Sequence, residues 1–584
     1  MKWKASIYWF IVFVCISFYF FYFASYTFDV QEEMQLFIPS WHSLKESLLQ
    51  SGGMTQWLGM FSIQYFSNSL FAAILNGLLV TMVGVCCYSL LQKIHSKGYN
   101  LLLSLILPLS LCKTHLKLDY LIDGTYAFVF MMLLLVWVFA YYKKRMISGV
   151  IGSFFVYWFT GQIVFVYGLL FLLLGLLIWK SYKEGLLVLF TSFILGWIGC
   201  RFALQTPLTD GFANEDFFHT LLQPDGYIYY VWIRLSIMLA MLCITVWALR
   251  YLPDKNKMVN VCVYFFIVLG LLFWGKVSMP DESDMQNRMM DSLNYLTKRQ
   301  RWSTILNMHQ GKQHLGVVSL NYVNMALSQE KQLGNRLFDY PQRGPLGLIV
   351  SYNLTYYISI VLSDVFYTIG DIASSESYAV EAQTLARRGG GSPRAMQRIV
   401  QTSLIRGNKS MADKYLRILK QLPKYRQWAE RYETYLTDEV AMRQEKEIGD
   451  RVAGQHVQDN LLTLVPTDEL LKLHLTDSSN QRTPFEYVGC YYLLDKDLDK
   501  MRQLLELTDE IPEYSPLPKH FQEAAAMIFH QEPERLSSMQ IDQQVLSDFS
   551  DFLRLLKNNS RMDLNRKYGN TFWHYYYLNP YKRQ

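Results

Sequence analysis

The chain has 584 residues, of which 51% are hydrophobic and 15% aromatic, and its formal net charge at pH 7 is +6. This length is too great for one domain on size alone, and so small a net charge gives no indication of nucleic-acid binding. Residues 1 to about 276 form a series of long apolar runs, whereas most charged residues lie beyond residue 280. The composition therefore predicts an integral membrane domain, 1–276, followed by a soluble domain, 277–584.

The eight cysteines indicate neither a disulfide framework nor a zinc site. Seven of them lie in or beside apolar runs, where cysteine behaves as a small hydrophobic residue, and only Cys490 lies in the second half. The sequence has no CxxC pattern and no Cys/His spacing of the kind that binds zinc. We predict no metal site from these residues.

Nine apolar runs in the first half are candidates for membrane spans. Basic residues, beginning with Lys2 and Lys4, recur in alternate connections, which places the N-terminus in the cytoplasm by the positive-inside rule. Nine spans leave the second half outside, in the periplasm of a Gram-negative cell, so we expect a multi-pass protein of the bacterial inner membrane. The nine runs lie near 7–26, 68–92, 100–116, 123–141, 149–160, 163–179, 184–204, 228–250 and 257–276.

The apolar run from Ile147 to Trp179 has basic residues at both ends. A single tilted helix here would reverse the pattern of basic residues downstream. A broken pair of helices that turns near Thr160-Gly161-Gln162 preserves it. Such broken segments are tolerated in membranes where they line a polar cavity.

Three carboxylates follow the first apolar run, Ile7 to Tyr26, within two helical turns of the membrane exit. They are Asp29, Glu32 and Glu33. Two interpretations are open: a solvated loop, as expected for most charged residues, or a catalytic acid or base placed where a lipid-borne substrate presents its head group.

Two short amphipathic helices are predicted in the same outer segment. Apolar residues at positions 41, 44 and 48 have helical spacing. Ser51-Gly52-Gly53 ends this helix, and a second begins at Met54 and runs to Phe61. Trp41 and Trp57 suit the head-group region, so we expect both helices to lie along the membrane surface.

The order of a span, an acidic segment, two interfacial helices and a second span resembles the start of the polytopic C-type (GT-C) glycosyltransferases, which use polyprenyl-phosphate-linked sugars. The resemblance covers 1–276 and is architectural. In that superfamily a carboxylate of the first outer loop is the catalytic base. Its motif usually holds Asp or Asp-Glu, and the nearest match here is Glu32-Glu33, with Asp29 one turn earlier. The stretch Gln31–Phe37 also resembles Gln-Glu-x-x-Gln-Leu-Phe in Bacteroidota membrane proteins of unknown activity.

Cationic residues in the predicted outer loop from Lys113 to Asp123 depart from the positive-inside rule. The loop contains Lys113, His115 and Lys117, together with Asp119. One interpretation is that these cations stabilise a leaving phosphate as charge builds on its oxygens. The other is that the lysines reach the phosphates of lipid head groups.

Two arginines near the ends of later runs are further candidates for binding a lipid phosphate. Arg201 ends the seventh run, and Arg234 lies one or two turns into the eighth. A charge in a span costs roughly 2.5–3.5 kcal/mol and so tends to be functional or paired. For Arg234 the alternative is a salt bridge to Asp216 or Asp225.

The second half reads as consecutive helices with short polar breaks, and several windows resemble tetratricopeptide units. Repeats of this type stack because one helix pair cannot bury its apolar face alone, and they bind partners on the concave face. The alternative is a plain helical cap on the membrane domain. The whole chain is thus expected to be all-α, a transmembrane bundle followed by an α-solenoid. The windows are 302–327, 366–386, 403–423 and 491–512.

Three functions remain open. The first is an inner-membrane glycosyltransferase with a lipid-linked sugar donor, a protein or glycan acceptor, contacts to membrane lipids and, since paired carboxylates and phosphate suit hard cations, a Mg or Mn ion. The second is a non-enzymatic scaffold of an envelope or secretion complex. The third is a transporter, which ranks last because the spans show no internal symmetry. The sequence contains no Walker loop, GxSxG, HExxH or dinucleotide fingerprint.

Overall fold

The computed structural model describes residues 2–140, 145–205, 231–253, 257–386, 390–445, 448–449, 451, 482–509 and 515–581. In these residues the secondary structure is helical and contains no β-strand, so the predicted all-α class is confirmed. The chain divides into two compact units, Met1–Asp291 and Ser292–Gln584. The division falls inside helix α15 (Glu282–Lys298), whereas the end of the last apolar run predicts it at residue 276.

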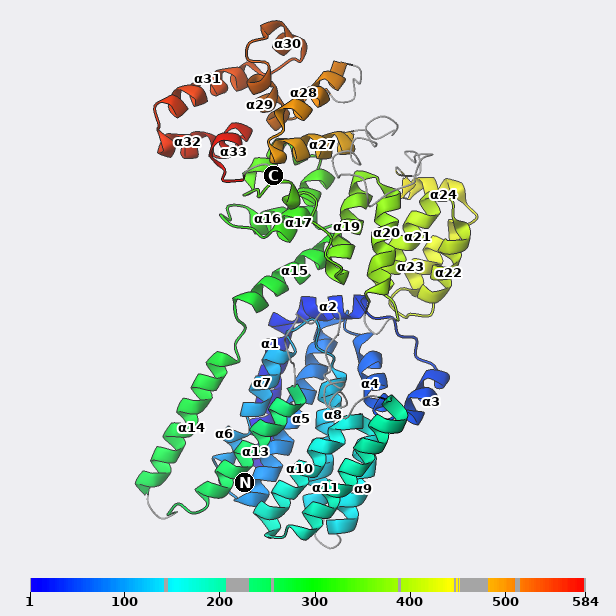
Figure 1. Ribbon diagram of the computed structural model, residues 1–584, viewed down its shortest axis with the longest axis vertical. Helices are drawn as coiled ribbons and strands as arrows, with labels where there is room; N and C mark the ends of the chain where they lie inside the picture. Colours follow the sequence, from blue (N-terminus) through cyan, green and yellow to red (C-terminus); the bar gives the residue numbers. More distant parts are fainter. Residues whose placement is uncertain are drawn as a thin grey trace. The chain divides into compact units, whose positions relative to one another are not determined.

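The first unit is a bundle of long apolar helices with shorter helices at one end (Figure 1). One extensive apolar core joins α1, α5, α8, α10 and α13. The helices of this unit that precede α15 are α1 (Lys2–Phe23), α2 (Ser25–Glu33), α3 (Trp41–Leu49), α4 (Gly53–Ile63), α5 (Ser69–Ile94), α6 (Asn100–Leu103), α7 (Ile106–Thr114), α8 (Asp123–Ala140), α9 (Arg145–Thr160), α10 (Val164–Leu174), α11 (Lys183–Ile198), α13 (Val231–Leu249) and α14 (Lys257–Val277).

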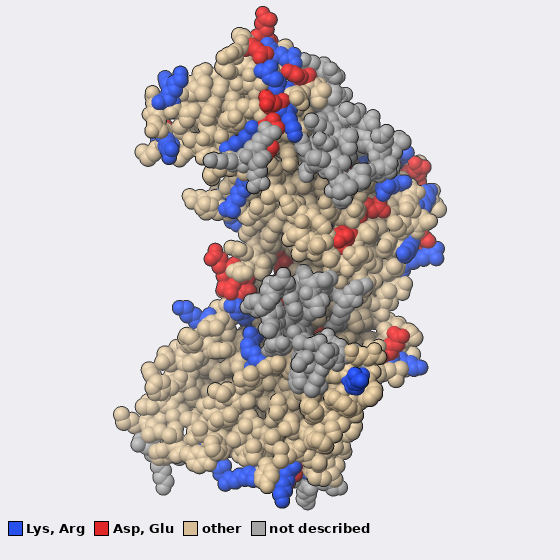
Figure 2. Space-filling view, viewed as in Figure 1, with Lys and Arg blue, Asp and Glu red and all other residues tan. Residues whose placement is uncertain are grey.

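Seven helical runs among the described residues are long and apolar enough to cross a bilayer, so the chain is a membrane protein. The sequence predicts nine. Two differences account for this: Asn100–Thr114 is short and divided into α6 and α7, and Arg145–Trp179 counts as one run. On the face drawn in Figure 2, the flank of the bundle carries few charged residues, and Lys and Arg gather at its lower end.

The run Arg145–Trp179 turns back on itself where the sequence predicts a break. α9 ends at Thr160, and Gly161 has a φ of 71° at the start of a 3-10 turn that leads into α10. The Arg145 guanidinium lies 4.6 Å from the centre of the Trp179 ring, and the Tyr167 hydroxyl donates to the Gly149 carbonyl at 3.3 Å. These contacts show that α9 and α10 are antiparallel.

The two predicted amphipathic helices are confirmed as α3 and α4. Ser40 caps α3 with a reciprocal Ser40–Ser43 capping box, and no residue of α3 is buried. The turn between the helices docks on the end of α9, because the Gly52 amide donates to the Trp158 carbonyl at 3.0 Å and the Ser51 hydroxyl to the Tyr157 carbonyl at 2.8 Å. Gly52 has a φ of 77°, which favours glycine.

The second unit is an array of helices in which α19 to α23 each pack on the next (Figure 1). All four windows identified in the sequence contain a pair of helices; their assignment as tetratricopeptide units stays a prediction. The helices are α16 (Trp302–His309), α17 (Val317–Gln329), α18 (Leu333–Arg336), α19 (Tyr356–Ile369), α20 (Ile372–Thr384), α21 (Pro393–Ile405), α22 (Lys409–Leu419), α23 (Arg426–Thr434), α24 (Glu439–Gln444), α27 (Arg482–Asp495), α28 (Leu498–Glu506), α29 (Lys519–Ile528), α30 (Pro533–Ser538), α31 (Gln543–Lys557), α32 (Arg561–Tyr568) and α33 (Phe572–Leu578).

Three of these pairs share one turn. A residue with positive φ closes the first helix, and the next residue, Asp or Asn, caps the second by accepting a backbone N–H. In the window that lacks glycine, Lys496 adopts the same conformation with a φ of 61°. The turns are Gly370-Asp371, Gly407-Asn408 and Lys496-Asp497.

The close packing of α9 on α10 generates a stability prediction. A Cβ at Gly152 would overlap the hydroxyl oxygen of buried Tyr167, whereas one at Gly270 on α14 meets nothing within 4 Å. We expect Gly152→Ala to lower the melting temperature of the detergent-solubilised protein, at a cost of about 1–3 kcal/mol. Gly270→Ala should not lower it, because alanine favours the helix and no atom obstructs its Cβ. Adding Tyr167→Phe to Gly152→Ala removes the overlapping oxygen and should restore part of the loss. A double variant no more stable than Gly152→Ala contradicts this packing.

Candidate functional site

The segment with the three predicted carboxylates is a helix, not a loop. α2 continues α1 after a break at Ala24, with backbone bonds from the Ala24 amide to Phe20 and from the Phe28 amide to the Ala24 carbonyl, both 2.9 Å. No glycine or proline occurs between Ala24 and Glu33, so nothing in the backbone ends the helix early. The solvated loop that one of the two interpretations expects here is therefore a helix.

Asp29, Glu32 and Glu33 are buried, with 1%, 3% and 0% of their surfaces exposed. Their i, i+3, i+4 spacing places them on one face of α2. The solvated-loop interpretation therefore does not fit. Burying acidic side chains costs free energy unless they are paired or protonated, and such groups concentrate at functional sites.

A fourth carboxyl group, Asp291 of α15, joins this end of the membrane unit. It accepts a hydrogen bond from the Thr27 hydroxyl of α2 at 2.6 Å. Burial, opposed by this hydrogen bond and assisted by the negative charge of Glu33, raises the pKa of Asp291 to about 7. The buried cluster thus contains a carboxyl group able to hold or release a proton near neutral pH.

Gln31 brings α2 to the segment that contains the predicted cations. Its side-chain amide lies 3.4 Å from the carbonyls of Lys117 and Leu118 and 3.5 Å from that of Tyr120, at the long limit for hydrogen bonds. Helix α2 and the segment 113–123 are therefore neighbours. Gln31 makes this contact from the side of α2 opposite Asp29 and Glu33, since residues two positions apart on a helix point in opposite directions.

Within that segment, Lys113 is an ion-pair partner of α15. Its ammonium lies 3.0 Å from Asp281 and 3.8 Å from Asp284. These carboxylates partly neutralise Lys113, and a substrate phosphate would compete with them.

His115 is a structural residue. It is 2% exposed, and its two ring nitrogens lie 2.7 Å from the Asn76 amide oxygen and 2.7 Å from the Thr125 hydroxyl. The Thr125 hydroxyl also contacts the Tyr120 hydroxyl at 2.8 Å. With both nitrogens occupied, His115 anchors the segment and is not available as a phosphate ligand.

The remaining predicted cations differ in placement. Burial lowers the pKa of Lys117, opposed by the negative charges of Asp119 and Asp284 and assisted by the positive charges of Arg234 and Lys113. Arg234 is exposed and donates to the Thr114 hydroxyl at 3.0 Å. Arg201 is exposed at the end of the helical turn Gly199–Leu204 and forms no hydrogen bond or ion pair with another described residue. The loop from Asp210 to Asp225, with the predicted alternative partners of Arg234, lies outside the described residues.

The described residues contain no group of three or more His, Cys, Asp or Glu side chains that could hold a metal ion.

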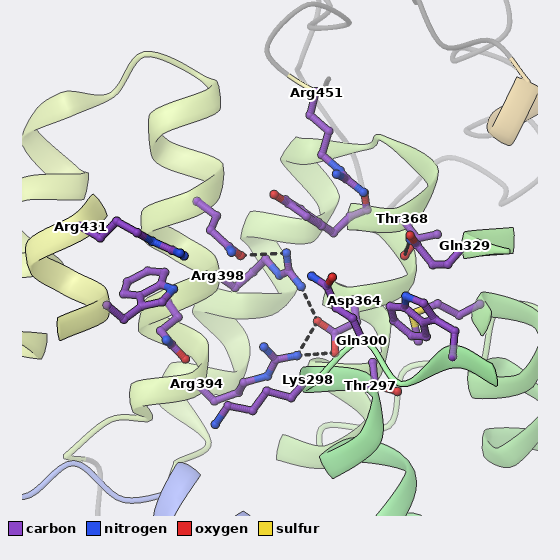
Figure 3. Close-up of a pocket in the computed structure, with 16 residues that line it drawn as sticks. Thr297, Lys298, Gln300, Gln329, Asp364, Thr368, Arg394, Arg398, Arg431 and Arg451 are labelled. Carbon is purple, nitrogen blue, oxygen red and sulfur yellow. Dashed lines mark hydrogen bonds and ion pairs between the residues drawn. The ribbon is translucent and has the colours of Figure 1, made fainter. Parts of the chain in front are cut away.

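Sequence reasoning missed a cavity in the second unit. It measures about 300 Å³ and lies among α15, α17, α19, α21 and α23 (Figure 3). Arg394 and Arg398 of α21 both bond to Asp364 of α19 inside it. None of the site residues predicted from the sequence lies in this cavity.

A signal for this cavity was present in the sequence. Positions 394, 397, 398 and 401 carry Arg, Gln, Arg and Gln at helical spacing, and 364, 367 and 368 carry Asp, Tyr and Thr in the same way. Each stripe alone is typical of a solvated helix face. Only the packing of α19 and α21 in one array shows that the two stripes enclose a common space.

Nearly the whole chain matches one protein family. Residues 1–579 match the family of unknown function DUF6057. The chain belongs to this family. The match covers both units, so both are part of what the family shares. No curated protein matches the chain, and no solved structure does.

The buried carboxyl of Asp291 predicts a pH dependence of stability. Between the ordinary aspartate pKa of about 4 and the raised value, the folded state keeps a proton that the unfolded state releases. Stability therefore falls as pH rises, by up to about 1.4 kcal/mol per unit. We expect Asp291→Asn to lose this dependence, so that its melting temperature rises relative to the wild type from pH 5 to pH 7.

The control is Asp281→Asn. Hydrogen bonds from the Asp284 backbone and Lys113 lower the pKa of Asp281, so this group stays ionised over the same range. Its variant should differ from the wild type by a constant amount. A constant difference for Asp291→Asn as well would show that Asp291 titrates normally.

Proposed function

We propose that the chain is a membrane glycosyltransferase that moves a sugar or glycan from a polyprenyl-phosphate or polyprenyl-pyrophosphate donor to an acceptor on the periplasmic side. The observation that carries this proposal is the burial of Asp29, Glu32 and Glu33 on one face of α2, directly after the α1 span. A lipid-linked donor presents its anomeric carbon at the depth of its head group, which suits a base at the end of a span.

In the proposed reaction Glu32, supported by Glu33 or Asp29, accepts the proton of an acceptor hydroxyl. The hydroxyl oxygen forms a bond to the anomeric carbon as the bond from that carbon to the phosphate oxygen breaks, with inversion. Lys117 and Arg234 stabilise the negative charge that the leaving phosphate acquires. Lys113 contributes only where the phosphate displaces Asp281 or Asp284, because it is ion-paired to both.

The proposed topology is a nine-span bundle in a bacterial inner membrane. Basic residues at helix ends support this topology. They are Lys93 in the last turn of α5, Arg145 at the start of α9, and Lys183 at the start of α11. By the positive-inside rule, the end of the bundle that carries these residues is cytoplasmic. In the proposal α6–α7 and the α9–α10 pair supply the spans beyond the seven long runs, and the second unit is a periplasmic tetratricopeptide-like array that presents the acceptor.

A non-enzymatic scaffold is the second candidate. It is favoured by the consecutive packing of α19 to α23, since such arrays bind partners along an extended surface. In this case the spans anchor the array, and the buried carboxyl groups only fix the position of α2.

The glycosyltransferase proposal is tested with Glu32→Gln and Glu33→Gln in the full-length protein, with transfer from a lipid-linked sugar as the readout. Loss of the base should slow transfer by about 100-fold or more in at least one variant. Glu46→Gln is the matched control, because Glu46 lies on α3 with an exposed side chain and pairs, among the described residues, with exposed His42. It should retain full activity.

Full activity in both variants removes the assignment of the base. The scaffold gains support if affinity purification of the full-length protein from its own membranes yields a stoichiometric partner that Glu32→Gln retains, with a wild-type phenotype. If the protein is an enzyme that needs Glu32, cells carrying Glu32→Gln should show the phenotype of cells that lack the protein.

A further inference from the structure

The cavity of the second unit has an excess of positive charge. Among the described residues, its wall contains one anionic side chain, Asp364, and five cationic ones, which are Lys298, Arg394, Arg398, Arg431 and Arg451. Figure 3 shows these side chains, contributed by different helices, around one space. A partly enclosed group of cations is electrostatically suited to an anion, because the low local dielectric strengthens the attraction.

Asp364 holds two of the arginines in fixed positions. It is 4% exposed, and its carboxylate accepts bonds from the Arg394 guanidinium at 2.7 and 2.9 Å and from the Arg398 guanidinium at 2.6 Å. One negative charge thus orients two positive ones. Arginines fixed in this way lose little conformational entropy when they bind a carboxylate or phosphate.

Aromatic rings provide a second type of surface in the same cavity. The guanidinium groups of Arg398 and Arg451 lie 3.7 and 4.2 Å from the centre of the Tyr367 ring. Trp302 and Trp428 also line the cavity and are half-buried. Flat apolar faces beside charged groups suit a ligand that combines an oxyanion with a ring.

Buried polar atoms in the wall point to a ligand with hydroxyl groups. The Thr297 hydroxyl and the Arg398 Nε are buried and have no hydrogen-bond partner in the part of the chain that the structure describes. A buried polar group without a partner costs about 1–3 kcal/mol. Four glutamine side chains, at 300, 329, 397 and 401, add amide groups to the wall.

From these features we propose that this cavity binds an acidic sugar, a monosaccharide-sized ring with a phosphate or carboxylate group. The arginines bind the oxyanion, a tryptophan face packs on the ring, and Thr297 and the glutamines bond to the hydroxyls. The volume of about 300 Å³ lies at the small end of ligand pockets. The proposal goes beyond the glycosyltransferase assignment and does not depend on it, because the described residues that line the cavity all lie in the second unit.

The test is calorimetric titration of the full-length protein in detergent with glucose 1-phosphate, glucuronic acid, glucose, inorganic phosphate and adenosine monophosphate. At least one acidic sugar should bind about tenfold more tightly than glucose, phosphate or the nucleotide. The two acidic sugars distinguish a phosphate from a carboxylate ligand.

Two variants locate the binding site. Arg431→Gln removes an exposed cation that lies 3.9 Å from Glu445 and makes no ion pair with Asp364, and it should weaken acidic-sugar binding about tenfold. Arg443→Gln, on an exposed side chain outside the cavity, is its matched control and should change nothing. Thr297→Val keeps the side-chain shape and breaks no hydrogen bond to a described residue, so it should weaken binding without lowering the melting temperature.

The proposal is overturned by any of three results. These are no binding of either acidic sugar, binding of phosphate or adenosine monophosphate as tight as that of the acidic sugars, and affinity unaffected by Arg431→Gln and Thr297→Val.

Discussion

The burial of acidic side chains at the end of a membrane span is the constraint on which the first unit depends. Carboxyl groups buried away from water are tolerated only if they are hydrogen-bonded, paired or protonated, so the neighbours of α2 matter. Thr27 connects it to Asp291 of α15, and Gln31 contacts the segment after α7. That segment is itself fixed by His115, whose two ring nitrogens connect α5 to α8. The free-energy cost of burying these carboxyl groups is understandable if the protein needs them in fixed positions.

Much of this architecture follows from local sequence. The spacing at 41, 44 and 48 and the glycines at 52 and 53 predicted α3, the turn and α4, because helix periodicity and positive φ are local properties. The break at Gly161 was also predicted, from the distribution of basic residues on either side. The helix pairs of the second unit were identified by apolar residues at helical spacing and by turn residues such as Gly370 and Gly407.

The candidate sites were less predictable, because they depend on contacts between residues far apart in sequence. Lys113 pairs with Asp281 and Asp284, and Thr27 bonds to Asp291, which no local pattern indicates. His115 was predicted to bind substrate from its neighbours in sequence, but its surroundings are supplied by α5 and α8. The cavity of the second unit could not be predicted for the same reason. Its polar residues on α19 and on α21 face a common space only when the two helices pack in one array.

Helix α14 differs from the other long helices of the bundle in that none of its 21 residues is buried. Val263 and Ile267 pack against the core and Tyr264 meets the Tyr99 ring, but most of the helix surface is left to lipid. The hydrophobic match to the bilayer therefore contributes strongly to its position. The tilt of α14 should follow bilayer thickness while α5 and α8, which are buried in the core, keep theirs. The lipid composition of the host membrane is thus one of the determinants of how this helix is oriented.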